Sequence, residues 1–295
     1  MQIARTTGAE PLPGYRLIEP LGSGGFGEAW KCEVPGGFCK AIKFVNGNLY
    51  AHDGGTAAAA KQELEALQHI KAIRHPFLLS TERVEIVDGE LLIVMELADK
   101  NLQDHLTECQ ATGLPGVPRE ELLSLLLEAA EALDWLNFQH GLQHLDIKPR
   151  NLFLVSGHVK VADFGLVNRV VNRNDSDEAE YHGGTTPLYA PPEILKGQIS
   201  RHCDQYCLAI VYQQLLTDTL PFSGRNARQL MVQHLSAAPD LSPLPVADQA
   251  IVAKALAKDP EQRYGSCLQF LQALLCAASE VQGTPPLTRR PTRLW

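Results

Sequence analysis

A short run of polar residues, His144-Leu-Asp146-Ile-Lys148-Pro-Arg-Asn151, brings a carboxylate, an ammonium group and an amide together within eight positions. A second carboxylate follows in Asp163-Phe164-Gly165. Transfer of a phosphoryl group needs a carboxylate for the attacking hydroxyl, a cation beside the phosphate, and oxygen ligands for Mg²⁺. The order and spacing of these residues therefore predict phosphoryl-transfer chemistry rather than a chance polar loop.

Two features nearer the N-terminus fit that chemistry. Gly22, Gly24 and Gly27 lead into a strand-like segment and not into a helix. This favours a hairpin whose backbone N–H groups approach phosphates over a dinucleotide-binding turn, and a plain tight turn is the alternative. Lys43 lies in an apolar, strand-like stretch, where a buried lysine needs anionic partners. Glu63 and the phosphates of ATP are candidates, and a lysine that reaches the surface is the alternative.

The elements that must position these residues change in type near 97–101. Before that point, short strand-like segments alternate with turn residues, and one helical stretch covers about 56–73. Beyond it, apolar residues recur at helical spacing. The pattern predicts a strand-rich N-terminal part and a helix-rich C-terminal part. Later helices are predicted at 204–216, 227–235, 247–257 and 266–278.

Composition excludes several other classes of protein. The 295 residues carry a net charge of −8, which argues against a nucleic-acid binder, and at this length one core tends to divide into two lobes. The seven cysteines are scattered without a CxxC pair, and Cys203 and Cys207 are interpreted as buried apolar residues rather than metal ligands. The start lacks an apolar signal region and no apolar run is long enough to span a membrane. These features predict a cytoplasmic protein without a membrane span.

With these motifs in this order, the chain resembles a eukaryotic-type Ser/Thr protein kinase domain of the kind found in bacteria. The resemblance implies an α+β, bilobal fold, with an antiparallel sheet plus one helix in a small N-lobe and a large helical C-lobe. The implied division is a flexible arm at 1–14, a kinase domain at 15–278 (N-lobe 15–97, hinge 96–101, C-lobe 102–278), and a flexible Pro/Arg-rich tail at 279–295.

The resemblance also implies roles for single residues. Asp146 would be the catalytic base, Lys148 would contact the γ-phosphate, and Lys43 would hold the α- and β-phosphates while pairing with a helix glutamate. Glu63 is the expected partner because apolar residues follow it at helical spacing, with Glu65 as the alternative. The cofactors implied are ATP and Mg²⁺, with Mn²⁺ as an alternative ion. The other positions are the glycine-rich loop (Gly22, Gly24, Phe26, Gly27), the adenine contacts (Ala41, Met95, Glu96, Leu97, Ala98), the metal ligands (Asn151, Asp163) and four supporting residues (Thr186, Glu193, Asp204, Arg263).

The chain departs from the kinase pattern at a few positions. Leu145 stands where many kinases have an arginine that pairs with a phosphate on the activation segment. Activation is therefore predicted not to depend on that ion pair. Ala29 replaces a valine over the adenine, and Thr185 and Pro191 alter the segment that ends at Glu193. The polar stretch 168–185 is predicted to be an activation segment with autophosphorylation at Ser176, Thr185 or Thr186.

The predicted activity is transfer of the γ-phosphate of ATP to Ser or Thr hydroxyls of a protein substrate. A pseudokinase that binds without turnover is one alternative, supported by Leu145 and the altered segment before Glu193. A small-molecule kinase is the other. It is disfavoured because such enzymes usually lack the Asp163-Phe164-Gly165 triplet and the long segment ending in Pro191-Pro-Glu193.

Overall fold

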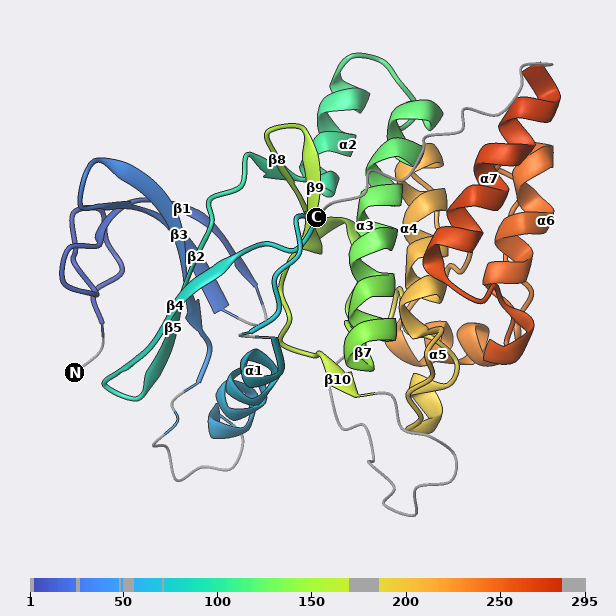
Figure 1. Ribbon diagram of the computed structural model, residues 1–295. Helices are drawn as coiled ribbons and strands as arrows, with labels where there is room; N and C mark the ends of the chain where they lie inside the picture. The colour runs from blue at the N-terminus through green and yellow to red at the C-terminus, as the bar shows by residue number, and fades with distance from the viewer. Residues whose placement is uncertain are drawn as a thin grey trace.

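The two halves of the chain fold as two lobes of different composition. The computed structural model of the protein describes residues 3–24, 27–47, 49, 56–70, 72–169 and 186–282. Figure 1 shows a lobe with a sheet and one helix beside a larger lobe built mainly from helices. The predicted α+β, bilobal architecture is confirmed.

The N-lobe sheet has antiparallel strands in the order β1-β2-β3-β5-β4. Gly36 and Gly37 connect β2 to β3 with positive φ, which glycine adopts without a steric penalty. Side chains alternate along β3, so Ile42 and Phe44 are buried on one face while Lys43 extends from the other. The strands are β1 (Arg16–Gly24), β2 (Gly27–Val34), β3 (Phe38–Val45), β4 (Thr81–Val87) and β5 (Glu90–Met95).

The helix α1 (Thr56–Ile70) lies against this sheet (Figure 1). Glu63, Leu67 and Ile70 are buried on one face of α1 because they recur every three or four residues. The helix ends earlier than the predicted stretch of 56–73. Pro76 follows closely, and a proline disfavours helical backbone in the residue before it.

Residues 3–14 lie on the outer face of the N-lobe sheet, although the sequence predicts a flexible arm there. Two backbone hydrogen bonds of 2.8 Å join Gly8 and Ala9 to Leu17 of β1. Leu12 is buried in a cluster with residues of β2, β3 and β5. The guanidinium of Arg5 lies 4.9 Å from the centre of the Phe44 ring. The arm is ordered because it covers apolar side chains that a bare sheet would expose to water.

The C-lobe is organised around α3 (Arg119–His140) and α4 (Cys203–Thr217), which pack against each other. α3 ends at Gly141, whose left-handed backbone caps the helix. The predicted later helices are all present, and the last one continues past 278. Among the described residues, every helix is too short or too polar to traverse a bilayer. The remaining helices are α2 (Leu102–Ala111), α5 (Ala227–Ser236), α6 (Val246–Ala255) and α7 (Cys267–Gln282).

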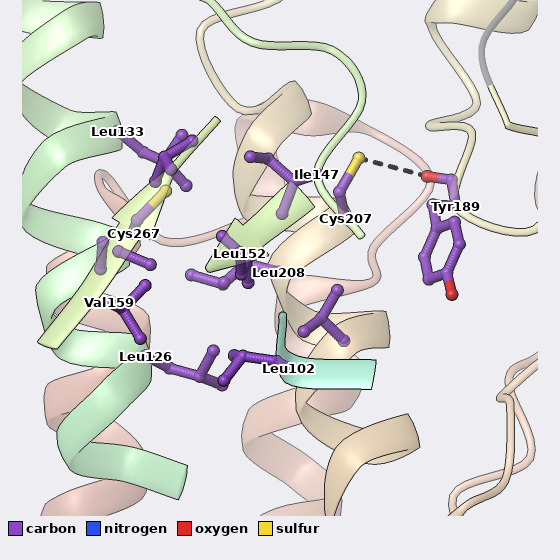
Figure 2. Packing of buried hydrophobic residues seen from close by; sticks show 14 of the residues in the cluster. Leu102, Leu126, Leu133, Ile147, Leu152, Val159, Tyr189, Cys207, Leu208 and Cys267 are labelled. Atoms are coloured by element: carbon purple, nitrogen blue, oxygen red, sulfur yellow. Dashed lines mark hydrogen bonds between the residues drawn. The ribbon is translucent and has the colours of Figure 1, made fainter. Parts of the chain in front are cut away.

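Short strands and 3-10 turns flank the polar loop of residues 144–151, which packs against this helical core. Figure 2 shows Ile147 from that loop and Leu152 at the start of β8 packed with Leu133, Val159 and Leu208. The Cys207 thiol donates to the Tyr189 carbonyl at 3.2 Å, and Cys203 and Cys207 are buried, reduced residues. The elements are β6 (Lys100–Asn101), β7 (Leu142–Gln143), η1 (Pro149–Asn151), β8 (Leu152–Val155), β9 (His158–Val161), β10 (Asn168–Arg169), η2 (Ile194–Lys196) and η3 (Pro260–Gln262).

Candidate active site

The glycine-rich segment forms the hairpin between β1 and β2. Gly24 pairs with Gly27, and Gly22 pairs with Ala29. Gly27 has a φ of 145°, and a Cβ built there would lie only 2.1 Å from the Phe44 carbonyl oxygen. Any side chain at this position would therefore push β2 away from β3. Phe26, the predicted tip of the hairpin, lies outside the described residues.

Lys43 joins the two lobes through a pair of carboxylates. Its Nζ lies 2.9 Å from Glu63 Oε1 on α1 and 2.6 Å from Asp163 Oδ1 in the C-lobe. The structure places Glu63 at this ion pair, whereas Glu65 is exposed. Burial would lower the pKa of Lys43, but the charges of Asp163 and Glu63 outweigh burial and leave that pKa raised. Lys43 is therefore a fully charged group in the space between the lobes.

The carboxylate of Asp146 receives three hydrogen bonds from predicted site residues. Thr186 Oγ1 donates to Oδ1 at 2.8 Å, and Lys148 Nζ donates to Oδ2 at 2.7 Å. Asn151 Nδ2 donates to the same Oδ2 at 3.0 Å. Lys148 also donates to Thr186 Oγ1 at 3.1 Å, so base, cation and hydroxyl form one connected group.

Asp204 holds the backbone of the loop of residues 144–151 in place. Its two carboxylate oxygens accept from the backbone N–H groups of His144 at 2.7 Å and Leu145 at 2.9 Å. Burial raises the pKa of Asp204, and the nearby His144 and backbone N–H groups oppose that effect. Leu145 adopts a φ of 66°, which a branched side chain occupies only where its surroundings impose it. The sequence gives no direct sign of this backbone conformation.

Leu145 is buried in a small apolar cluster where many kinases have a charged residue. The side chain packs there against apolar neighbours and contributes no cation. The cluster consists of Leu145, Leu166, Ile194, Ile199 and Cys203.

Asp163 and Asn151, the two predicted metal ligands, both carry side-chain oxygen atoms. Both side-chain hydrogen bonds of Asn151 to described residues are donated by Nδ2, so its Oδ1 remains available as a ligand. Burial would raise the pKa of Asp163, but Lys43 holds it below the usual value, so the carboxylate is ionised. An amide oxygen and an ionised carboxylate are the hard donors that Mg²⁺ prefers, and the donor set fits that ion.

The structure adds roles that sequence reasoning did not assign. His144 is buried, its Nε2 lies 3.0 Å from the Ala162 carbonyl oxygen, and its ring centre is 5.2 Å from that of Phe164. A Cβ built on Gly165 would lie 2.3 Å from Glu63 Oε2, so any side chain at this position would force that carboxylate to shift. In the sequence, the Asp163-Phe164-Gly165 triplet was the motif that could have indicated both the contact of His144 with Phe164 and that of Gly165 with Glu63.

The predicted hinge connects β5 to β6. Met95 pairs with Ala41 across the sheet. The Glu96 carboxylate accepts from Lys160 Nζ at 2.8 and 2.9 Å, so it ties the hinge to the C-lobe. No residue that the structure describes is hydrogen-bonded to the backbone of Leu97 or Ala98, which leaves those N–H and C=O groups able to bind an adenine edge.

Glu193 and Arg263 form a bidentate pair with distances of 2.7 Å. Glu193 also accepts from the Ser200 hydroxyl at 2.8 Å. Burial would raise the pKa of Glu193, but Arg263 holds it below the usual range. Ser176 and Thr185, two predicted phosphorylation sites, lie outside the described residues.

Comparison with known proteins agrees with this geometry. Residues 15–280 match the protein kinase domain family. Serine/threonine-protein kinase PknF of Mycobacterium tuberculosis is 30% identical over 276 residues, which cover 88% of this chain and 56% of the relative. Serine/threonine-protein kinase pkn2 of Myxococcus xanthus is 30% identical over 309 residues, which cover 94% of this chain and 35% of the relative.

A third relative is the probable serine/threonine-protein kinase PknB of Lactococcus lactis, 27% identical with 85% of this chain and 40% of the relative covered. The chain thus spans about half the length of PknF, and less of the other two. The match extends over the glycine-rich hairpin, both carboxylates and the bidentate pair described above. The chain therefore belongs to the protein kinase domain family.

Proposed function

We propose that this chain transfers the γ-phosphate of ATP to Ser and Thr hydroxyls of proteins, including its own. The observation that carries the proposal is the connected group of Asp146, Lys148 and Thr186, in which an alcohol donates to the carboxylate at 2.8 Å. That is the distance at which a substrate hydroxyl would deliver its proton to a general base.

In this mechanism the acceptor oxygen bonds to the γ-phosphorus as the bond to the β–γ bridging oxygen breaks. The proton of the acceptor passes to a carboxylate oxygen of Asp146, and ADP leaves. Lys148 lies beside the transferred group, and Lys43, held by Glu63, binds the inner phosphates. These residues position the reacting groups and stabilise their charge, and these two effects account for most of the catalysis of phosphoryl transfer by proteins.

Asn151 Oδ1 and the Asp163 carboxylate would hold Mg²⁺, or Mn²⁺ in its place. The ion, when bound, neutralises charge on the phosphates. The Leu97 and Ala98 backbone would bind adenine, with Ala41 and Met95 beside the ring. The glycine-rich hairpin of Gly22, Gly24 and Gly27 would cover the phosphates.

The test is phosphate transfer from γ-labelled ATP to casein and to the chain itself, with phosphosite mapping. Asp146→Asn and Asp163→Asn should each reduce incorporation about 100-fold or more, since each removes a group that the chemistry uses. Glu120→Gln, which neutralises an exposed carboxylate on α3, should keep the activity. Equal incorporation by all four proteins would refute the proposal. ATP binding with no transfer would indicate a pseudokinase.

A further inference from the structure

The N-terminal segment of residues 3–14 is bonded to β1, the strand that leads into the glycine-rich hairpin. Thr7 Oγ1 donates to the Ile18 carbonyl oxygen at 2.9 Å. Two backbone hydrogen bonds of 2.8 Å join the same segment to Leu17. These bonds hold the segment against the sheet, and Arg5 lies over the outer face of that sheet.

The guanidinium of Arg5 bridges two strands of the sheet. Its Nη2 donates to Glu90 Oε2 on β5 at 2.8 Å, and its Nη1 donates to Glu28 Oε2 on β2 at 3.4 Å. The guanidinium also lies 4.9 Å from the centre of the Phe44 ring on β3, the strand between β2 and β5. The three charged side chains are only 14% to 28% exposed, so salt and water screen these ion pairs less than pairs on an open surface.

Glu28 lies directly beside the glycine-rich hairpin and is held by two side chains. It follows Gly27 in β2. Its Oε1 accepts from Trp30 Nε1 at 2.7 Å, while its Oε2 accepts from Arg5. Trp30 is itself buried in the apolar cluster on the outer face of the sheet. The carboxylate is therefore fixed between a buried ring and a guanidinium, at the point where β2 leaves the hairpin.

Phe44 connects the Arg5 contacts to the opposite face of the sheet. Its buried ring lies under Arg5, and its carbonyl oxygen would be only 2.1 Å from a Cβ built on Gly27. The preceding residue, Lys43, extends from the other face and pairs with Glu63. The same short stretch of β2 and β3 thus carries the Arg5 contacts on one face and the predicted phosphate contacts on the other.

We propose that Arg5 is a positioning residue for ATP, which acts through Glu28 and Phe44 to hold the glycine-rich hairpin in place over the phosphates. This inference rests on the proposed kinase function. A hairpin that is already held in its binding position loses less conformational freedom when the nucleotide binds, and this strengthens binding. Loss of the Arg5 contacts therefore weakens nucleotide binding more than it slows phosphate transfer.

The experiment uses the purified full chain and measures the Kd for a fluorescent ATP analogue with Mg²⁺, the KM for ATP, and kcat with casein. Arg5→Ala should raise both the Kd and the KM about fivefold, the upper range for an ion pair that is not fully buried, while kcat changes less than about twofold. Arg5→Lys keeps the charge but loses the forked geometry, so its Kd should lie between those of Arg5→Ala and the wild type.

The matched control is Arg16→Ala. Arg16 also pairs with a glutamate of β2, Glu33, but at the end of that strand away from the hairpin. The variant removes the same kind of ion pair from the same strand, and it should keep the wild-type Kd and KM.

Amide hydrogen exchange without nucleotide tests the local cause. Arg5→Ala should accelerate exchange in residues 20–29, while the amides of α4 stay protected, because loss of a local contact opens a local unit. Equal acceleration in α4 would mean a general loss of stability and would overturn the positioning role.

A double variant tests the route through Glu28. In Arg5→Ala with Glu28→Gln, the loss of nucleotide binding should be smaller than the two single losses added as free energies. If Arg5→Ala binds the analogue as the wild type does, or if Arg16→Ala weakens binding equally, the assignment of Arg5 is overturned while the kinase activity stands. If the wild type neither binds the analogue nor transfers phosphate, the proposed function fails, and this inference fails with it.

Discussion

The guanidinium of Arg263 holds the carboxylate of Glu193 through two hydrogen bonds of 2.7 Å each, and both side chains are buried. Arg263 also donates to the carbonyl oxygens of Ala257 and His202, each at 2.9 Å. The pair therefore ties the segment that follows Thr186 to the last helices of the C-lobe. Both partners are charged and buried, so removal of either leaves a buried charge behind.

Arg263→Ala should lower the free energy of unfolding by about 4 kcal/mol, because Glu193 would remain buried without its cation. Arg263→Lys keeps the charge but loses the bidentate geometry, and should fall between Ala and the wild type. Urea unfolding of the three proteins measures the difference. A loss below about 1 kcal/mol for Arg263→Ala would show that the pair behaves like a surface ion pair.

Gly165→Ala should impair catalysis much more than stability. The new Cβ would fall 2.3 Å from Glu63 Oε2, so the carboxylate must move and release Lys43. A displacement of about 1 Å near the reacting groups can reduce kcat/KM about 100-fold. The check combines kcat/KM with thermal unfolding.

Glu63→Asp tests whether the effect of Gly165→Ala arises from the clash with the Glu63 carboxylate, because the aspartate side chain is shorter. In the double variant with Gly165→Ala, the combined loss of kcat/KM should be smaller than the two single losses added as free energies. Strict additivity would mean that Gly165 acts on something other than Glu63.

Leu145→Arg should lower the free energy of unfolding of the domain. The side chain would place a cation among Leu166, Ile194 and Cys203, and the Glu193 carboxylate that Cys203 contacts is already held by Arg263. An unpaired buried charge costs several kcal/mol, about 3–5 when measured by loss of a partner. Leu145→Met, which keeps the apolar volume, should cost less than about 1.5 kcal/mol. Thermal and urea unfolding compare the two, and a stable, active Leu145→Arg protein would contradict the packing role.

Stability should fall on mild acidification, in part through His234. Burial lowers the pKa of His234 to about 4, with a contribution from Lys258, while the Tyr206 hydroxyl lies 2.9 Å from its Nδ1. The unfolded chain takes up a proton near pH 6.5 and the folded chain only near pH 4, so this stability is present above pH 6.5 and lost as the pH falls to about 4. The full loss is about 3 kcal/mol.

His234→Gln should reduce the slope of the unfolding free energy against pH between pH 7 and 4.5, relative to the wild type. His140→Gln, at an exposed histidine that ends α3, is the control and should keep the slope. Identical slopes for the wild type and His234→Gln would mean that other buried groups set the pH dependence.

Local patterns were enough to predict much of this molecule. Strands and helices follow from apolar spacing and turn residues that lie within a few positions of one another. The order of Gly22, Lys43, Asp146 and Asp163 indicated phosphoryl transfer for the same reason, since the residue types themselves carry the chemistry.

Tertiary structure decided what depends on contacts between distant segments. Glu63 and Glu65 sit on one helix, and only the packing of α1 against the sheet turns Glu63 toward Lys43. Residues 3–14 read as a polar arm, yet the apolar outer face of the sheet orders them. The positive φ of Leu145 is imposed by Asp204, which lies far along the chain and holds the adjacent backbone N–H groups. A single sequence does not encode such pairings locally, because they arise only when both segments have packed.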